Sequence, residues 1–307
     1  MKKDFLSLKD FTPEELLDII KYALILKQER ANGTAHNFLK NKKVALIFEK
    51  PSTRTRVSFE VGVYELGGYP LFLNSNDIQL GRGESIGDTA KILSRYVDMI
   101  MIRTFEHEKI VEMASQASVP VINGLTDKFH PCQVMADVMT LYEKAKKIKG
   151  LNIAFIGDIN NVAMSWLHAA GKLGMNISIA SPEGYNCNAS VLEDAKKMAD
   201  VSGGVIQITK DPFQAVKGAD VVYTDVWVSM GMEEESAKRR EVFRNYQVNK
   251  DLMDAAGKKT YFMHCLPVHI DEEVTKEVYE SENSIVFDQA ENRLHVQKAI
   301  MALLIKY

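Results

Sequence analysis

The sequence is poor in the features that mark several large classes of protein. It has three cysteines in 307 residues, Cys132, Cys187 and Cys265, an odd count without the spacing of a metal site. This excludes a disulfide-linked scaffold and predicts a reducing, cytoplasmic location. Basic residues are not in excess, since 38 Lys and Arg stand against 41 Asp and Glu for a net charge of −3. We therefore expect no nucleic-acid surface.

Long hydrophobic runs are also missing. No apolar stretch reaches the length of a membrane span, so we expect no membrane contact. Residues 1–8 contain no long apolar segment, so no signal peptide is expected. Gly157-Asp158-Ile159-Asn160 follows a predicted strand, where a dinucleotide-binding fold would carry its glycine fingerprint, but the G-x-G-x-x-G spacing is missing. This argues against a nicotinamide-dependent dehydrogenase on an α/β architecture.

What is present is an alternation of apolar runs with helical patterns along the whole chain. Such alternation implies right-handed crossovers and parallel sheets with helices on both sides. Because 307 residues exceed one typical core, we predict two doubly wound parallel-sheet α/β domains that divide near residues 145–150. The predicted strands are 44–48, 98–103, 119–122, 152–157, 176–180, 205–209, 220–224, 261–265 and 284–287.

The pentad Ser52-Thr53-Arg54-Thr55-Arg56 is the most informative segment. It lies in the turn from the first predicted strand to a helical pattern, where unpaired N–H groups and the helix dipole favour an anion such as phosphate. The pentad has no glycine and no Walker lysine, and its hydroxyls and guanidinium forks suit a small, encircled phosphate. A capped helix with solvated arginines is the alternative for this segment alone. We expect Arg56 to be structural and to pair with a carboxylate.

Polar and reactive side chains also follow most of the other predicted strands. Ligands of open α/β sheets bind at the carboxyl ends of the strands, so these residues are candidates for a shared site. A structural loop could hold any one of them, but the whole set favours a binding site. Asn160 and Trp227 are expected only to shape their loops. The candidates are Arg103, His130, Gln133, Asn161, Asp225, Ser229, Met230, Cys265, Leu266 and Arg293.

Four segments in this order resemble the carbamoyltransferases, and within them the ornithine branch. They are Ser52–Arg56, His130-Pro131-Cys132-Gln133, Asp225–Gly231 and His264-Cys265-Leu266-Pro267, and the resemblance covers essentially the whole chain. It implies transfer of the carbamoyl group of carbamoyl phosphate to the δ-amine of L-ornithine, giving L-citrulline and phosphate without a metal or cofactor. It further implies a carbamoyl-phosphate domain (1–148), an ornithine domain (149–288) and a C-terminal helix (289–307) that packs back on the first domain.

The resemblance also implies a role for each candidate. The residues expected to bind carbamoyl phosphate are Ser52, Thr53, Arg54, Thr55, Gln79, Arg103, His130, Gln133, Cys265, Leu266 and Arg293. Thr55, Arg103 and His130 would donate hydrogen bonds to the carbamoyl oxygen. Gln133 and the Leu266 carbonyl would accept from the carbamoyl amino group. Gln79 would reach the phosphate of a neighbouring subunit in a homotrimer or a multiple of it, unless it is an ordinary surface glutamine.

The residues expected to bind ornithine are Asn161, Asp225, Ser229 and Met230. Because a free alkylamine has a pKa of about 10.4, a group must orient its neutral form, and Asp225 and Cys265 are the candidates. Cys265 could be a thiolate beside cations or a small packed hydrophobe. Putrescine, or the substrate of another carbamoyltransferase, is an alternative to ornithine, and a non-catalytic phosphate-binding protein is a further one. Residues 268–271 depart from the sequence typical of the family.

Overall fold

The computed structural model describes residues 2–75, 83–228 and 233–306, which fold into two compact units. The first unit comprises Met1–Thr140 and Glu291–Tyr307, and the second comprises Leu141–Ala290. The divisions fall within two helices, α5 (Pro131–Ala145) and α12 (Val286–Leu304). The C-terminal helix therefore returns to the first unit, as predicted.

The first unit is built on a parallel sheet with the strand order β2-β1-β3-β4. From β1 the chain continues to β2 on one side of the sheet, and from β3 it continues to β4 on the other side. The topological switch point therefore lies between the ends of β1 and β3. At that point the register pairs Phe48 with Arg103. The strands are β1 (Lys43–Phe48), β2 (Tyr69–Asn74), β3 (Met99–Arg103) and β4 (Val121–Leu125).

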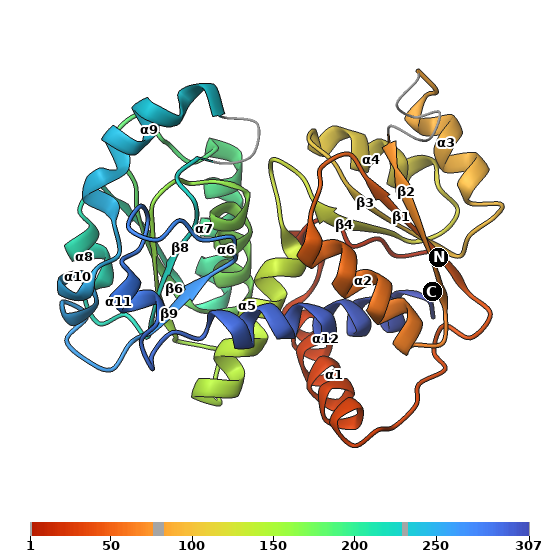
Figure 1. Cartoon of the computed structure of the whole chain (residues 1–307), viewed down its shortest axis with the longest axis horizontal. Helices are drawn as coiled ribbons and strands as arrows, with labels where there is room; N and C mark the ends of the chain where they lie inside the picture. Colours follow the sequence, from red (N-terminus) through yellow and green to blue (C-terminus); the bar gives the residue numbers. More distant parts are fainter. Residues whose placement is uncertain (1, 76–82, 229–232, 307) are drawn as a thin grey trace. The chain divides into compact units, whose positions relative to one another are not determined.

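Helices cover both faces of this sheet. One face packs Ala45, Ile47 and Ile100 against Ile110 and Met113 of α4. Figure 1 shows α3 and α4 on this side of the sheet and α1, α2 and α12 on the other. The helices are α1 (Pro13–Ala31), α2 (Thr53–Glu65), α3 (Ile86–Leu93) and α4 (His107–Gln116), preceded by the 3-10 turn η1 (Leu8–Asp10).

Close packing joins α2 to α12 within the first unit. A Cβ on Gly62 would lie 3.2 Å from Met301 Cε and 3.3 Å from Lys298 Cγ, so a larger residue at this position would require these side chains to shift. On the polar side Lys298 Nζ donates to Glu65 at 2.7 Å. These contacts bring a C-terminal helix against the helix that carries the arginine-rich pentad.

The second unit contains five parallel strands in the order β7-β6-β5-β8-β9. Its switch point lies between β5 and β8, because the chain runs outward from β5 through β6 and β7, then returns to β8 and β9. The strands are β5 (Asn152–Ile156), β6 (Asn176–Ala180), β7 (Val205–Thr209), β8 (Val221–Thr224) and β9 (Tyr261–His264).

Large aromatic side chains fill the core beside the central strands of the second unit. The rings of Phe155 and Tyr223 stack at 5.3 Å, and Trp166 of α6 meets Tyr223 edge-on at 5.9 Å. The helices are α6 (Asn161–Leu173), α7 (Ala189–Ser202), α8 (Pro212–Val216), α9 (Ser236–Phe243), α10 (Lys250–Asp254) and α11 (Lys276–Tyr279), with 3-10 turns η4 (Glu233–Glu235) and η5 (Arg244–Tyr246).

The predicted fold class, two doubly wound parallel sheets, is confirmed, but two details of the prediction were wrong. The strand β2 was missed, and residues 284–287 do not form a strand. Only an isolated bridge joins Ser284 to Phe262, and α12 begins at Val286. Within the described parts of the chain, no helix combines the length and apolar character that a membrane crossing needs.

Candidate functional site

The pentad forms the start of α2, directly after β1. Ser52 caps the helix, and its Oγ accepts from the Thr55 N–H at 3.2 Å. Thr55 is buried, while Ser52 and Arg54 are partly exposed and Thr53 is exposed. Arg56 pairs with Glu60 at 3.1 Å and lies over the Phe72 ring, so the predicted pairing of Arg56 with a carboxylate is confirmed. The turn therefore presents hydroxyls and one guanidinium at a helix N-terminus.

Arg293 connects the pentad to the start of α5. Its Nη2 donates to Thr55 Oγ1 at 3.1 Å and its Nη1 to Gln133 Oε1 at 2.5 Å. The three side chains are 1–2% exposed, and 238 and 160 positions of sequence separate Arg293 from its two partners. The structure thus brings together three residues that the sequence proposed separately.

His130 lies at the centre of the positive charge in this first-unit cluster. Burial, followed by the charges of Arg293, Arg103 and Arg54, lowers the pKa of His130 well below its usual value. The imidazole is therefore neutral near pH 7 and has one N–H to donate. Three guanidinium groups act electrostatically on one buried ring, and such an excess of positive charge favours an anionic ligand.

The cysteine beside this cluster has a different character. Cys132 is fully buried, its Sγ donates to the Asn123 carbonyl at 3.4 Å, and burial raises the pKa of its thiol to about 12. A thiol that stays protonated at neutral pH is a poor nucleophile. Cys132 is therefore a packing residue within the His130–Gln133 segment.

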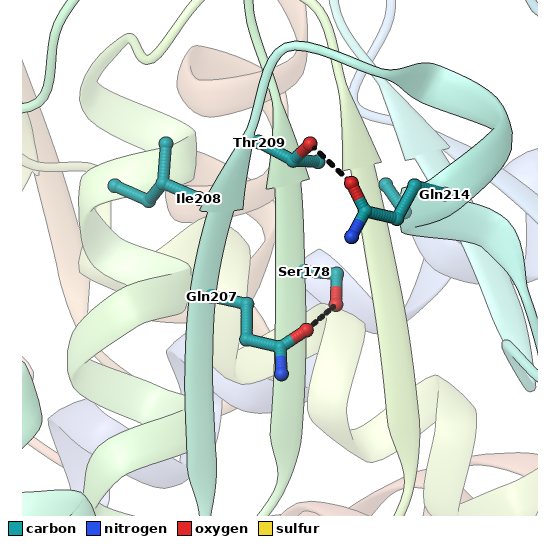
Figure 2. A pocket seen from close by; sticks show the side chains of 6 residues that line it. Ser178, Gln207, Ile208, Thr209 and Gln214 are labelled. Atoms are coloured by element: carbon teal, nitrogen blue, oxygen red, sulfur yellow. Dashed lines mark hydrogen bonds between the residues drawn. The ribbon is translucent and has the colours of Figure 1, made fainter.

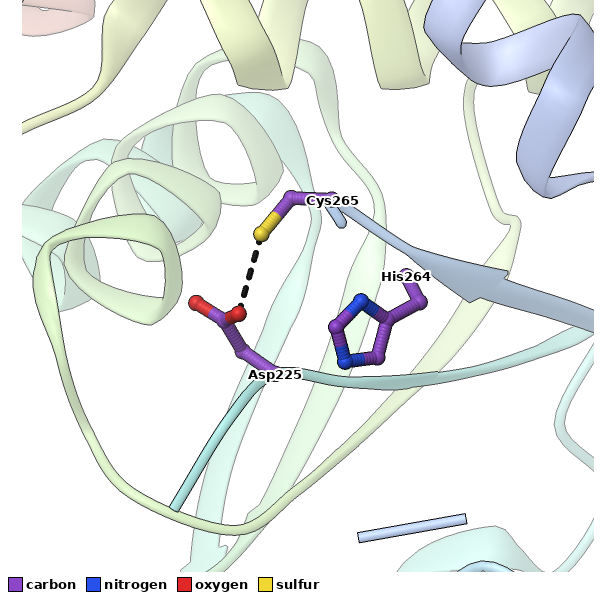
Figure 3. Close-up of side chains that lie close together, drawn as sticks. All are labelled: Asp225, His264 and Cys265. Carbon is purple, nitrogen blue, oxygen red and sulfur yellow. Dashed lines mark hydrogen bonds between the residues drawn. The ribbon is translucent and has the colours of Figure 1, made fainter. Parts of the chain in front are cut away.

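A second cluster lies at the carboxyl ends of the neighbouring strands β8 and β9 of the second unit, where Asp225 follows β8 and Cys265 follows β9. The Cys265 thiol donates to Asp225 Oδ1 at 3.0 Å, and Figure 3 shows this bond beside His264. The Val226 N–H also donates to Oδ1, at 2.8 Å. Because a thiolate would repel the carboxylate at this distance, the hydrogen bond requires a protonated thiol. This favours the thiol over the thiolate that the sequence left open.

Asn160 is a site residue that the sequence interpretation discounted. Its Nδ2 donates to Asp225 Oδ2 at 2.7 Å, while its Oδ1 caps α6 by accepting from the Val162 and Ala163 N–H groups. The helix cap thus fixes the amide that in turn fixes Asp225. The neighbouring Asn161, predicted to bind ornithine, begins α6 and is partly exposed.

The loop after β9 is held from behind by buried side chains. The Leu266 N–H donates to His264 Nδ1 at 2.9 Å, and His264 Nε2 lies 3.2 Å from Glu273 Oε1. His264 and Glu273 are fully buried. Leu266 has a φ of +59°, a left-handed conformation that non-glycine residues seldom adopt except where surrounding structure imposes it. These contacts fix the direction of the Leu266 backbone.

Three of the predicted site residues, Gln79, Ser229 and Met230, lie outside the described residues. Among the described residues, Arg54, Arg103 and Arg293 lie close enough to His130 to affect its pKa, and Thr55 and Gln133 bond to Arg293. In the second unit, Asp225 and Cys265 meet. The pocket over β6 and β7, lined by Ser178, Gln207 and Thr209 among others (Figure 2), contains none of the predicted residues and no charged group.

Two groups of side chains have donor atoms close enough for a metal ion, judged over the described ranges. They are Asp225, His264 and Cys265, and His269, Glu272 and Glu273, with donor atoms within 4.8 Å of one another. In the first group the Asp225 oxygens and His264 Nδ1 already accept internal hydrogen bonds. In the second, Arg240 pairs with Glu272 at 3.0 Å.

Comparison with known proteins agrees with the fold. Residues 3–143 match the family model for the aspartate/ornithine carbamoyltransferase carbamoyl-P binding domain, and residues 149–304 match the model for the Asp/Orn binding domain. The chain belongs to the aspartate/ornithine carbamoyltransferase family, and is therefore a carbamoyl-transferring enzyme.

Individual relatives are similar over almost their entire length. An ornithine carbamoyltransferase of Thermococcus kodakarensis is 55% identical over 302 residues, covering 98% of this chain and 96% of the relative. The solved ornithine carbamoyltransferase of Pyrococcus furiosus has a TM-score of 0.96 and 52% identity, covering 99% and 97%. The anabolic enzyme of Campylobacter jejuni subsp. jejuni has a TM-score of 0.93 and 43% identity, covering 98% of each chain.

Proposed function

We propose that this protein transfers the carbamoyl group of carbamoyl phosphate to the δ-amine of L-ornithine, giving L-citrulline and phosphate. The observation that carries the proposal is the concentration of Arg54, Arg103 and Arg293 around a neutral His130, beside the N-terminus of α2. The names of the relatives, ornithine carbamoyltransferases at 51–55% identity, support ornithine as the acceptor.

The first-unit cluster supplies the chemistry that carbamoyl phosphate needs. Ser52, Thr53 and Arg54 would hold the phosphate through hydroxyls, backbone N–H groups and a guanidinium fork. Thr55 accepts from Arg293, so its own O–H proton is left to donate. Together with Arg103 and neutral His130 it would donate to the carbamoyl oxygen, on which negative charge grows during attack. Arg293 adds positive charge at the same place.

The second-unit cluster supplies groups for the amine. Asp225 and Asn161, with Ser229 and Met230, would hold ornithine, and Asp225 with Cys265 would orient its δ-amine as the neutral nucleophile. The amine nitrogen forms a bond to the carbamoyl carbon, and the bond from that carbon to the phosphate oxygen breaks. The nitrogen loses one proton, which the departing phosphate takes as it becomes hydrogen phosphate. The carbonyls of Gln133 and Leu266 would accept from the carbamoyl amino group.

Substrate choice is tested by measuring initial rates of carbamoyl transfer to L-ornithine, putrescine and L-aspartate under identical conditions. We expect ornithine to give by far the highest kcat/KM, because its amino-acid head would use Asn161 and Ser229, which a plain diamine does not need. Equal or better turnover of putrescine would overturn the choice of ornithine. Binding of phosphate without any turnover would favour a non-catalytic protein.

The proposal also covers the oligomeric state and the residue bounds of the two ligand-binding domains. We expect a homotrimer or a multiple of it, in which Gln79 reaches the phosphate of a neighbouring subunit. Large apolar side chains on α2 and β2 support association, with Val57 50%, Tyr64 76% and Tyr69 63% exposed in the single chain. The ligand domains are proposed to span 1–148 and 149–288, with 289–307 completing the first. The cytoplasmic location stays a prediction.

A further inference from the structure

Gln133 lies between two partners that can each make only one kind of hydrogen bond. Its Oε1 accepts from Arg293 Nη1 at 2.5 Å, and its Nε2 donates to Asp137 Oδ1 at 2.8 Å. Gln133 is 1% exposed, Arg293 2% and Asp137 0%. Asp137 is one helical turn beyond Gln133 on α5. Neither the sequence interpretation nor the reaction chemistry above uses this buried carboxylate.

The two partners together determine which way the Gln133 amide points. The oxygen and nitrogen of an amide are nearly indistinguishable by shape, so its orientation follows from its hydrogen bonds. A guanidinium can only donate, and an ionised carboxylate can only accept. The reversed amide would set two donors against each other at Arg293 and two acceptors against each other at Asp137.

This orientation turns the carbonyl of Gln133 toward the place where Arg293 meets Thr55, and turns its amino group toward the body of α5. A carbonyl oxygen has two lone pairs, and Arg293 uses one of them. The second can accept from an N–H of a carbamoyl group. An acyl phosphate that carries a methyl group in place of the amino group offers no such donor.

We propose that Asp137 is a positioning residue that gives the enzyme its selectivity for an acyl phosphate bearing an amino group. It acts through Gln133, whose carbonyl it holds toward the acyl group by occupying the amide nitrogen. This inference rests on the proposed function, because it concerns the carbamoyl group of the donor. A ligand that lacks the amino group binds poorly because the buried Gln133 carbonyl that would accept from it is then left without this hydrogen bond.

Two substitutions separate this role from a role of the charge alone. Asp137→Asn keeps the shape and an oxygen that can accept from Gln133 but removes the charge. Asp137→Leu keeps approximately the shape but removes the acceptor. The matched control is Thr140→Val, since Thr140 is equally buried on the same helix but its hydroxyl bonds to Ala136 and Asn292.

The readout is the KM for carbamoyl phosphate in citrulline formation, compared with the inhibition constants of acetyl phosphate and inorganic phosphate. For Asp137→Leu we expect the KM to rise about tenfold or more, while both inhibition constants stay within about twofold of wild type. Asp137→Asn should stay within about threefold of wild type in all three constants. Thr140→Val should lose thermal stability and keep the wild-type ratio of KM to the acetyl phosphate constant.

Equal effects of Asp137→Asn and Asp137→Leu on the KM for carbamoyl phosphate would contradict the proposal. A loss of stability in Asp137→Leu, with the ratio of this KM to the acetyl phosphate inhibition constant unchanged, would also contradict it. If Asp137→Leu does not fold, Asp137→Ala enters the same comparison, because it also removes the acceptor and needs less space. Failure of the wild-type protein to form citrulline would count against the proposed function. If the wild type forms citrulline but the variants keep its selectivity for carbamoyl phosphate over acetyl phosphate, only the proposed role of Asp137 is contradicted.

Discussion

The thiol of Cys265 donates a hydrogen bond to the carboxylate of Asp225, with 3.0 Å between Sγ and Oδ1. The residues are 40 positions apart in the sequence and meet because β8 and β9 are neighbours in the sheet of the second unit. Asn160 holds the other carboxylate oxygen, Oδ2. The carboxylate is thus fixed from two sides before any substrate arrives, and the thiol acts as a hydrogen-bond donor.

Cys265→Ser should therefore be tolerated better than Cys265→Ala. The serine hydroxyl can still donate to Asp225, so we expect kcat/KM for ornithine within about tenfold of wild type, whereas alanine removes the donor and should cost more. The KM for carbamoyl phosphate should change less than the KM for ornithine in both. Steady-state kinetics with each substrate varied in turn measures this. Equal losses in the two variants would point instead to thiolate chemistry.

Asn160→Ala should impair both the stability of the second unit and the use of ornithine. The variant loses the cap of α6, worth about 0.5–2 kcal/mol, and the donor that fixes Asp225. Asn160→Asp retains a capping oxygen but places a second carboxylate against Asp225. In Asn160→Asp we expect the melting temperature to return close to that of wild type, whereas kcat/KM for ornithine should stay low. Restoration of both quantities to the same extent would show that Asn160 acts only as a cap.

His130→Asn should lower kcat by about 100- to 1,000-fold, the usual consequence of losing one donor to a developing oxyanion. Since the pKa of His130 lies well below 6.5, its imidazole stays neutral as the pH falls from 8 to 6. The wild-type pH–rate profile over this interval should therefore show no step from His130. A step near pH 6.5 that disappears in His130→Asn would contradict the neutral form.

The first unit should lose stability in mild acid. Burial, with the charge of Lys128, lowers the pKa of His107 to about 4, and burial also lowers those of His130 and His295. Because the unfolded chain takes up these protons near pH 6.5 and the folded chain only at lower pH, stability is complete above 6.5 and falls from there toward 4. His107→Gln should flatten this decline in urea unfolding measured from pH 7.5 to 4.5. Parallel curves for the two proteins would be the contrary result.

Arg239→Met should destabilise the second unit. Arg239 is 4% exposed, its Nε donates to the Trp227 carbonyl at 2.6 Å, and its Nη2 pairs with Asp158, whose pKa burial raises. Loss of the cation leaves the carboxylate of Asp158, whose side chain is 14% exposed, unpaired, at a cost of up to about 3–5 kcal/mol. Thermal unfolding measures the loss, and Arg239→Met combined with Asp158→Asn should recover part of it. No recovery in the double variant would show that the Trp227 contact carries the effect.

Some of this architecture could be predicted from the sequence because the relevant signals are local. The apolar runs that became β5, β6 and β7 carry their own strand pattern. The strand β2 was missed because Pro70 interrupts its pattern, and proline is tolerated there since β2 is an edge strand. The apolar run 284–287 was ambiguous between strand and helix at that length.

The partners of the candidate residues could not be predicted, because they depend on long-range packing. Gln133 meets a guanidinium 160 positions away, and Asn160 meets a carboxylate 65 positions away. Strand ends indicate which residues share an edge of a sheet, and this was enough to select Arg103, His130 and Asp225. The hydrogen-bonding contributions of Asp137 and Asn160 depend on side-chain directions, which a single sequence does not contain.

The central claim is that Arg54, Arg103 and Arg293 together bind one molecule of carbamoyl phosphate. Calorimetric titration with phosphonoacetamide, which has a methylene group in place of the bridging oxygen and cannot transfer its acyl group, tests it without turnover. We predict one site per chain, with Kd weakened about tenfold or more in each of Arg54→Met, Arg103→Met and Arg293→Met, and unchanged in Arg56→Met. Wild-type affinity in any one of the first three variants would contradict the account.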